Sequence, residues 1–311
     1  MSNHRKGVIA LFIAAVAFAV NGIVSKLVLE SGLSAWRLAE IRSTGAFAFF
    51  LFYALLFKRS AFKFELRALP EMLVYGIIGY ACVQAFYFVA ILRMPVSVGL
   101  IIEFTAPIWI ALWVRFVRKQ HVPRTMWLAV FLAFSGLLLI AQVWKGLIFD
   151  GIGLLAAFLD AFALTAYFLL GEKWGKRVAT ETLMLYGFGV SMLFWWIAFP
   201  IWTYPTEIFS KEIDIRGQAA GTIASGWMLI LFVIVIGTII PYIGNLIGIT
   251  KTSASSASVI GMLEPVLAGV FAWIWLSETF NAIQLIGAAA VIAGIYIATK
   301  TRATTQQIVP E

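Results

Sequence analysis

The stretch GLIIEFTAPIWIALWVRF, residues 99–116, is apolar almost throughout, yet it carries Glu103 and, four residues later, Pro107. A charged side chain at mid-bilayer costs at least about 2.5 kcal/mol. A proline inside a helix cannot donate a hydrogen bond to the carbonyl four residues earlier, and for Pro107 that carbonyl belongs to Glu103. The stretch therefore contains either a bend made for packing or part of a functional site.

The composition of the chain indicates whether it folds in water or in a membrane. Of the 311 residues, 62% are hydrophobic and 12% are charged, whereas soluble domains carry about 25% charged residues. Crossing a hydrocarbon core of about 30 Å takes about 20 apolar residues in a helix. The apolar runs are long and do not alternate with polar residues, so they predict an all-α integral membrane protein.

Ten apolar runs are predicted to cross the membrane. Their connections are short and leave no room for a separate soluble domain. The predicted spans are Gly7–Val28, Ala35–Phe57, Pro70–Leu92, Val96–Phe116, Thr125–Val143, Gly151–Gly171, Glu181–Tyr204, Ala224–Gly248, Ser253–Leu276 and Ala282–Thr299.

The distribution of Lys and Arg predicts the orientation, because cytoplasmic loops of membrane proteins are enriched in these residues. With the N-terminus inside, the outer connections hold only a few basic residues, Arg93, Lys145, Lys211 and Arg216. The inner side receives Arg5, Lys6, Lys58, Arg59, Lys63, Arg67, Arg115, Arg118, Lys119, Arg124, Lys173, Lys176, Arg177, Lys251, Lys300 and Arg302. Both termini are therefore expected in the cytoplasm. The same bias accounts for the net charge of +8 without a nucleic-acid partner.

Cysteine and histidine are too scarce for several kinds of site. Cys82 is the only cysteine, and the two histidines, His4 and His121, lie at the cytoplasmic edge. A Cys/His metal site and a Ser–His hydrolytic pair are therefore not expected. No Gly-x-x-x-x-Gly-Lys loop is present either. We expect a protein that is not an enzyme and that needs no metal or cofactor.

An internal repeat relates the two halves of the chain. A shift of 158 residues aligns residues of both halves without a gap, in the pairs Gly79 with Gly237, Ser97 with Ser255, Pro107 with Pro265, and Gly136 with Gly294. The first helices align less cleanly, through Gly7 and Gly151 at a shift of about 144. We therefore expect a first repeat over residues 1–146, a second over 147–300 and a cytoplasmic tail over 301–311.

An odd number of helices in each repeat has a geometric consequence. The second copy must enter the membrane from the opposite side, so that the two halves are related by a pseudo-two-fold axis in the membrane plane. Inverted repeats of this kind recur in secondary transporters, whose substrate sites lie near the midplane between the halves.

The last two predicted spans carry a resemblance to a known family. The stretches LEPVLAGVFAWIWLSE (263–278) and QLIGAAAVIAGIYI (284–297), with the five-plus-five plan, resemble the drug/metabolite transporter superfamily, EamA type. The resemblance implies a multi-pass carrier of the bacterial inner (plasma) membrane, with amino acid exporters, including aromatic amino acid exporters, among similar proteins. Where the second half has Ser277–Glu278, the first has Lys119–Gln120, so the family's usual glutamate is absent from the first copy.

The repeat also pairs the two proline kinks. The carbonyl freed by Pro265 belongs to Gly261, which the repeat equates with Glu103. Interrupted helices at corresponding positions are a sequence indicator of a transport site, although prolines also bend helices only for packing. The second half has its own carboxylate, Glu264, three residues beyond Gly261. Pro241 is expected to kink the eighth span.

Further polar and aromatic residues at membrane depth complete the predicted site. Asp160 lies close to the midplane, and Arg42 either snorkels outward or faces the cavity as a counter-ion. Asn21, Gln84 and Asn245 either line the cavity or bond helix to helix. Tyr80, Tyr87, Trp109 and Trp113 are expected to line the cavity and to favour a substrate with an apolar or aromatic portion.

These observations favour a secondary carrier that exports a small metabolite, such as an amino acid or a related amphipathic solute, by alternating access. Glu103 or Glu264 would carry a coupling proton or pair with a substrate ammonium group. A carrier of phosphorylated, nucleotide-linked or lipid-linked sugars is the alternative, but it needs several cations in the cavity, and only Arg42, with Lys26 less securely, is available. A channel or a purely structural bundle is the third possibility.

Overall fold

The computed structural model describes residues 3–145, 150–276 and 281–308, and it contains ten helices long and apolar enough to cross a membrane. This confirms the prediction of an all-α, ten-helix membrane protein. In chain order the spans are Asn3–Glu30, Ala35–Leu56, Leu69–Arg93, Val96–Val117, Arg124–Ala141, Gly151–Gly175, Thr180–Ala198, Gly226–Lys251, Ala254–Trp275 and Ala282–Thr301.

Six of these spans are single helices, and four are interrupted. The single helices are α1 (Asn3–Glu30), α2 (Ala35–Leu56), α7 (Arg124–Ala141), α8 (Gly151–Gly175), α9 (Thr180–Ala198) and α15 (Ala282–Ile308). The interrupted spans contain α3 (Leu69–Val74) and α4 (Val83–Arg93), α5 (Val96–Glu103) and α6 (Ala106–Leu112), α11 (Gly226–Ile234) and α12 (Ile240–Lys251), and α13 (Ala254–Gly261) and α14 (Leu263–Leu276).

The seventh span is shorter than predicted. It ends at Ala198 instead of Tyr204, because Pro200 follows. The residue before a proline is pushed out of the helical region, and Phe199 is accordingly extended, with φ −137° and ψ 92°. Beyond it lie a 3₁₀ turn at Ile201–Thr203, the short helix α10 (Glu207–Ser210) and an antiparallel pair of strands, β1 (Glu212–Asp214) and β2 (Ile223–Ser225).

The fourth and ninth spans break at equivalent positions. Helix α5 ends at Glu103 and is followed by Phe104. Helix α13 ends at Gly261 and is followed by Met262, which lies 158 positions after Phe104. Pro107 is the second residue of α6 and Pro265 the third residue of α14, so each proline follows the break closely. A missing N–H is tolerated in the first turn of a helix, where no intrahelical partner exists.

The third and eighth spans both contain a π-helical segment, Tyr75–Cys82 and Val235–Ile239 respectively. Shifted by 158 residues, the second segment falls within the first. Pro241 follows the second segment, whereas Val83 stands at the matching position of the first. The π geometry therefore does not depend on the proline, and segments of this kind are frequent at functional sites.

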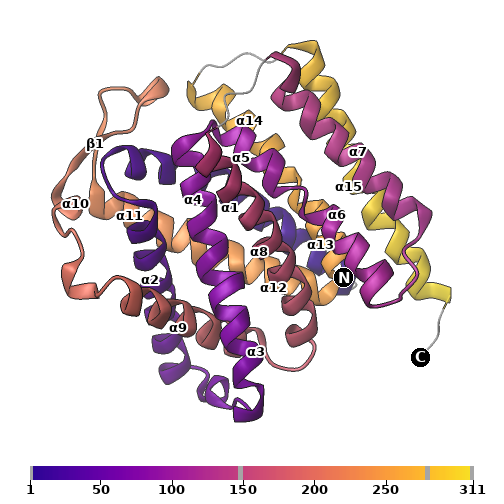
Figure 1. Ribbon diagram of the computed structural model, residues 1–311, viewed down its shortest axis with the longest axis horizontal. Helices are drawn as coiled ribbons and strands as arrows, with labels where there is room; N and C mark the ends of the chain where they lie inside the picture. Colours follow the sequence, from indigo (N-terminus) through magenta and orange to yellow (C-terminus); the bar gives the residue numbers. More distant parts are fainter. Residues whose placement is uncertain (1–2, 146–149, 277–280, 309–311) are drawn as a thin grey trace.

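The helix pairing follows the repeat. Span 1 packs on span 8 through α1 and α12, and span 3 packs on span 6 through α4 and α8; the repeat exchanges these two pairs. Helices α7 and α15, the fifth helices of the two halves, lie side by side at one edge of the molecule (Figure 1). They are antiparallel, because Gly136 meets Gly287 while Gly294 meets Ala129. These are the contacts that an inverted pair of repeats requires.

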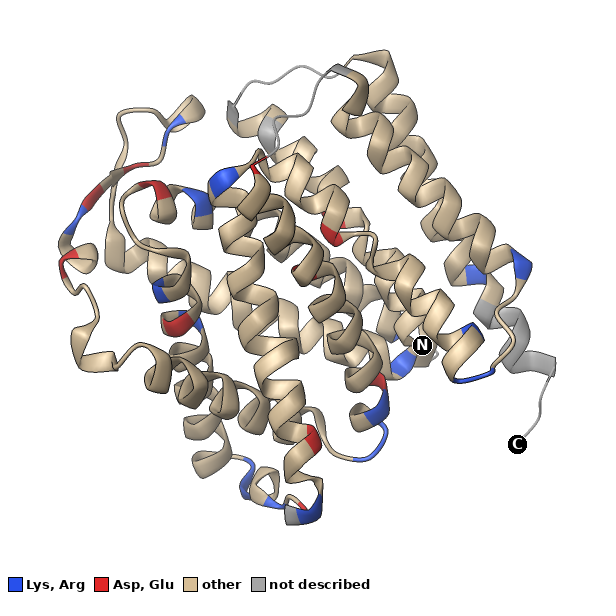
Figure 2. Cartoon of the chain, viewed as in Figure 1, with Lys and Arg blue, Asp and Glu red and all other residues tan. Residues whose placement is uncertain are grey.

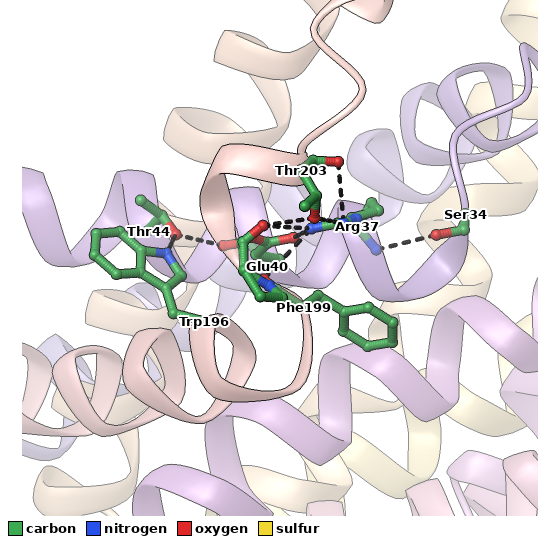
Figure 3. Close-up of polar contacts among 8 residues, drawn as sticks. Ser34, Arg37, Glu40, Thr44, Trp196, Phe199 and Thr203 are labelled. Atoms are coloured by element: carbon green, nitrogen blue, oxygen red, sulfur yellow. Dashed lines mark hydrogen bonds and ion pairs between the residues drawn. The ribbon is translucent and has the colours of Figure 1, made fainter.

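Polar contacts hold the second span to the seventh at the membrane edge (Figure 3). Ser34 caps α2, and Arg37 donates to Glu40 at 2.7 Å and to the Thr203 hydroxyl at 2.5 Å. One turn deeper, the Trp196 indole donates to Thr44 at 3.1 Å. These bonds join the repeats at the side of the membrane where α1 ends.

Charged residues lie mostly at the two ends of the helices, and many basic ones gather toward the end where α3 begins (Figure 2). Ion pairs cross between the repeats at this end, from Arg118 to Glu172 at 2.5 Å and from Lys173 to Glu71 at 2.5 Å. We call it the N-terminal side and the opposite one, where Glu30 ends α1, the vestibule side.

The cytoplasmic position of the termini stays a prediction that cysteine labelling can test. In a Cys82→Ser background, a membrane-impermeant maleimide applied to intact cells should label Ala220→Cys, near the β1–β2 hairpin, but not His4→Cys. Permeabilisation should expose both residues, because only the membrane shields the N-terminus. Labelling of His4→Cys alone in intact cells would reverse the orientation.

The α7–α15 crossing predicts a sensitive glycine. A Cβ on Gly136 would lie 2.5 Å from the Gly287 carbonyl oxygen, whereas a Cβ on Gly151 would meet nothing within 4 Å. Gly136→Ala should destabilise the fold by roughly 1–3 kcal/mol through overpacking, seen as a lower midpoint of thermal unfolding in detergent. Gly151→Ala is the matched control and should leave the midpoint unchanged. Equal midpoints for both variants would contradict the close crossing.

Candidate functional site

A small chamber of about 60 Å³ lies between the two halves. We call it the central chamber. Spans of both repeats contribute to its wall, which includes residues that flank the breaks in spans 4 and 9. It is lined by Ala15, Phe18, Asn21, Arg42, Val83, Gln84, Tyr87, Glu103, Phe104, Leu164, Tyr167, Phe168, Tyr242, Asn245, Gly261 and Glu264.

A larger cavity of about 630 Å³, which we call the vestibule, adjoins the chamber. It reaches Glu30 at the end of α1 and Arg216 in the β1–β2 hairpin, which form an ion pair. Phe18, Tyr87 and Glu264 line both cavities. The chamber is therefore approached from the vestibule side, past these side chains.

The guanidinium of Arg42 belongs to the chamber and does not snorkel to the surface. Its side chain is buried, and its Nε and Nη2 donate to the Thr238 hydroxyl at 2.7 Å and to the Gly237 carbonyl at 2.5 Å. The guanidinium carbon lies 4.9 Å from the centre of the Phe88 ring, within cation–π range. Both acceptors lie in the π-helical segment of span 8, which thus presents its backbone to a side chain of the first repeat.

Two carboxylates face the same chamber from the broken helices. Glu103 ends α5 directly before the break in span 4, and Glu264 lies in the first turn of α14 after the break in span 9. Oε2 of Glu103 is buried without a hydrogen-bond partner among the described residues. In that part of the chain, no carboxylate oxygen lies within 4.0 Å of the Arg42 nitrogens. The expected counter-ion contact with Arg42 is thus not formed.

The three amides predicted from the sequence also line the chamber. Asn21 accepts from the Ser25 hydroxyl at 3.0 Å, and it fits because Gly237 has no side chain: a Cβ there would lie 1.9 Å from the Asn21 Oδ1. The buried Gln84 amide lies beside the Tyr242 hydroxyl and forms no hydrogen bond of standard geometry within the described ranges. Asn245 reaches the chamber from α12. Buried polar groups are normally paired, so unpaired atoms in the wall suit a polar ligand or water.

Four predicted residues are not among those that line the chamber, namely Tyr80, Trp109, Trp113 and Asp160. Asp160 is buried one turn before the lining residue Leu164, and its Oδ1 lacks a partner in the described chain. Trp109 turns away, packs on Phe162 with ring centres 5.0 Å apart, and donates to Thr105. Trp113 is 46% exposed on the outside of the bundle. Helical spacing alone could not separate the inner from the outer face of span 4, because both faces are apolar.

Tyr80 lies behind the chamber, in a packed group that we call the aromatic cluster. Tyr167 and Tyr242 line the chamber on its N-terminal side, and Tyr80 packs on both, with ring centres 5.7 and 5.3 Å away. Tyr75 and Phe188 complete the cluster at 5.0 and 4.7 Å from Tyr80. Both Tyr75 and Tyr80 lie on the π-helical segment of span 3. The cluster fills the path between the chamber and the N-terminal side.

Several lining residues were not predicted from the sequence, namely Phe18, Phe104, Tyr167, Phe168 and Tyr242. Aromatic residues are abundant throughout the spans, so their type carried no signal. Phe104 had one indicator, its position directly after Glu103 at the proline break. Among the described residues, no three possible metal-ligating side chains gather. The chamber thus offers one cation, two carboxylates and amides within an aromatic wall.

Comparison with known proteins agrees with this architecture. The pattern of the EamA-like transporter family matches residues 5–142 and again residues 151–300. Each match covers five of the ten membrane-spanning helices.

Named relatives are transporters. The uncharacterized transporter YdfC of Bacillus subtilis is 26% identical over 233 residues, which are 74% of this chain and 71% of that protein. The threonine/homoserine exporter RhtA of Escherichia coli K12 is 26% identical over 271 residues, 86% of this chain and 81% of that protein. A crystal structure at 17% identity superposes with a TM-score of 0.74 over 97% of this chain and 99% of that one, which shows the fold alone.

The vestibule predicts a difference in thiol accessibility between two positions of span 9. Ala268 lines the vestibule, whereas Ala257 is fully buried between helices. In the Cys82→Ser background, a polar methanethiosulfonate reagent should modify Ala268→Cys at least about tenfold faster than Ala257→Cys, because thiol reactivity requires access. Mass spectrometry of the purified protein measures both rates. Equal rates would mean that the vestibule is closed in solution.

Proposed function

The chain belongs to the EamA-like transporter family, and we propose that it exports a small amino acid, or a closely related amphipathic metabolite, by alternating access. Family membership makes it a multi-pass membrane transporter and not an enzyme. The proposal adds the chemical class of the substrate, the direction and the mechanism. The substrate is a zwitterion, held at its two charged groups in the central chamber.

One observation carries the proposal: charges of opposite sign face the chamber without touching each other. Arg42 has hydroxyl, carbonyl and ring partners but no carboxylate within 4.0 Å among the described residues. Glu103 and Glu264 face the same space. Keeping a charge away from water costs several kcal/mol unless it is paired. A zwitterion supplies both missing partners, its carboxylate to Arg42 and its ammonium group to Glu103 or Glu264.

The polar and apolar parts of the wall also suit an amino acid. The Gln84 and Asn245 amides can bond to the substrate's polar end, while Phe104 and Phe168 can contact its side chain. The name of one relative, a threonine/homoserine exporter, agrees with this substrate class and with export. The chamber's small volume of about 60 Å³ favours a compact solute.

The transport cycle follows from the two ends of the chamber. The vestibule joins it on one side, and the aromatic cluster fills the other, so this form is open toward the vestibule side. In the opposite form the aromatic cluster would separate, and Phe18 with Tyr87 would close the vestibule side. The breaks at Phe104 and Met262 and the π-helical segments provide the bending points. Glu103 or Glu264 would bind the coupling proton when the ammonium group leaves.

A carrier of phosphorylated or nucleotide-linked sugars fits this chamber less well. A substrate with several phosphate charges needs several cations, but only Arg42 among the lining residues is cationic. Two carboxylates, Glu103 and Glu264, also line the chamber and would repel phosphate. Lys26 lies in the vestibule instead. A channel is disfavoured because the aromatic cluster closes one end, and saturable, trans-stimulated flux would distinguish a carrier from it.

Counterflow of radiolabelled amino acids in liposomes tests the proposal. Arg42→Gln and at least one of Glu103→Gln and Glu264→Gln should lower the initial rate at least about tenfold, because truncating one partner of a buried charged contact typically costs 2–5 kcal/mol. The glutamate variant that lowers the rate should also lose the dependence of transport on an imposed pH gradient. A Glu71→Gln variant, whose carboxylate pairs with Lys173 at the N-terminal surface, is the control and should transport normally.

Two results would contradict this proposal. Unchanged counterflow and pH dependence in both glutamate variants would remove the carboxylates from the mechanism. An absence of counterflow for every amino acid by the folded wild-type protein would remove the substrate class.

A further inference from the structure

The breaks in spans 4 and 9 bring Phe104 and Gly261 together on the chamber wall. Phe104 is the first residue after α5, and Gly261 is the last residue of α13. A Cβ built on Gly261 would have the Cε1 atom of the Phe104 ring, 3.6 Å away, as its nearest neighbour. The two residues come from different repeats, and the Phe104 ring lies at contact distance from the position that a Gly261 side chain would occupy.

Gly261 differs from the glycines that allow helices to pack closely. A Cβ on Gly136, Gly244 or Gly248 would lie 2.2–2.7 Å from an atom of a neighbouring helix, so packing excludes a side chain there. A Cβ on Gly261 would meet only the Phe104 ring, at a distance typical of van der Waals contact. Helix packing thus gives no reason for a glycine at 261, and its missing side chain leaves space on the chamber side.

The repeat relates Gly261 to a position of the first half that carries a side chain. Gly261 stands 158 positions after Glu103, so one wall of the chamber carries a carboxylate side chain and the equivalent position of the other wall carries none. At the two equivalent positions the chamber is consequently polar at Glu103 and open, beside the Phe104 ring, at Gly261, and Glu264 lines the wall three residues further along. An amphipathic ligand would place its charged end at the first and its side chain at the second.

We propose that Phe104 and Gly261 form the subsite for the substrate's side chain and set its maximum size. The inference rests on the proposed amino acid transport and adds a specificity-determining pair to it. The Phe104 ring covers the side chain, and the absence of a Cβ at 261 provides the room for it. A larger residue at 261 would shorten the tolerated side chain, and a smaller one at 104 would lengthen it.

Competition in the counterflow assay tests the pair. Unlabelled glycine, alanine, threonine, leucine and phenylalanine would compete with radiolabelled alanine, and the half-inhibitory concentration of each gives a size profile. Gly261→Ala should weaken inhibition by the larger competitors, and Gly261→Val should weaken it at least about tenfold relative to glycine, since one methylene in a pocket discriminates 10–200-fold. Phe104→Leu and Phe104→Ala should shift the profile the opposite way, toward larger competitors.

Gly99→Ala is the matched control for Gly261→Ala. Gly99 is another helical glycine, and a Cβ there would lie 3.4 Å from Ile91, but Gly99 is buried and does not line the chamber. Its variant should keep the wild-type profile. Size-exclusion chromatography establishes that each variant is folded, and Gly261→Ala with Phe104→Leu carry the test if the larger changes fail to fold.

The outcomes separate this inference from the function on which it rests. Wild-type counterflow that amino acids inhibit, with one size profile for wild type and for all folded variants at 104 and 261, would overturn the subsite and leave the proposed function standing. Folded wild-type protein that no amino acid inhibits would overturn both. Opposite shifts for the two positions, with an unchanged Gly99→Ala profile, are the result that we expect.

Discussion

The contact between Arg42 and the π-helical segment of span 8 is the interaction on which the site depends. The guanidinium is held by the Gly237 carbonyl and the Thr238 hydroxyl, so a charge from the first repeat is fixed by a backbone carbonyl and a side-chain hydroxyl of the second. An α-helix uses its carbonyls internally, and a π turn alters that ladder. Gly237 also leaves the space that Asn21 occupies. One residue without a side chain thus lets a cation and an amide reach the same wall.

Other parts of the site repeat this principle, because the two carboxylates of the chamber also adjoin an interruption of a helix. Glu103 and Glu264 lie on either side of the breaks in spans 4 and 9, and two rings of the aromatic cluster lie on the π-helical segment of span 3. In hydrocarbon, irregular backbone is tolerated only where it is buried in protein or lines a cavity. The constraint explains why interruptions and functional side chains occur together.

Much of the fold followed from the sequence, since hydropathy measures the same transfer energy that selects membrane helices. The ten spans, the matched proline breaks and most polar residues of the chamber could be predicted from residue type and the repeat. The π-helical segments could not, because Val83 and Pro241 occupy matching positions and yet both segments form. Nor could the directions of Trp109 and Trp113, because lipid and protein interior are equally apolar and periodicity does not distinguish them.

The unequal pair at Glu103 and Gly261 has an energetic consequence for the whole cycle. If the two inverted repeats were identical, the two open forms would be related by the two-fold axis and would have equal free energy. Here position 103 carries a carboxylate whereas its equivalent, Gly261, carries none, and the aromatic cluster of Tyr75, Tyr80, Tyr167, Phe188 and Tyr242 lies on one side of the chamber. Every such difference biases the equilibrium between the forms. In the proposed cycle the empty protein would therefore favour one orientation, and the substrate would meet it on one side of the membrane.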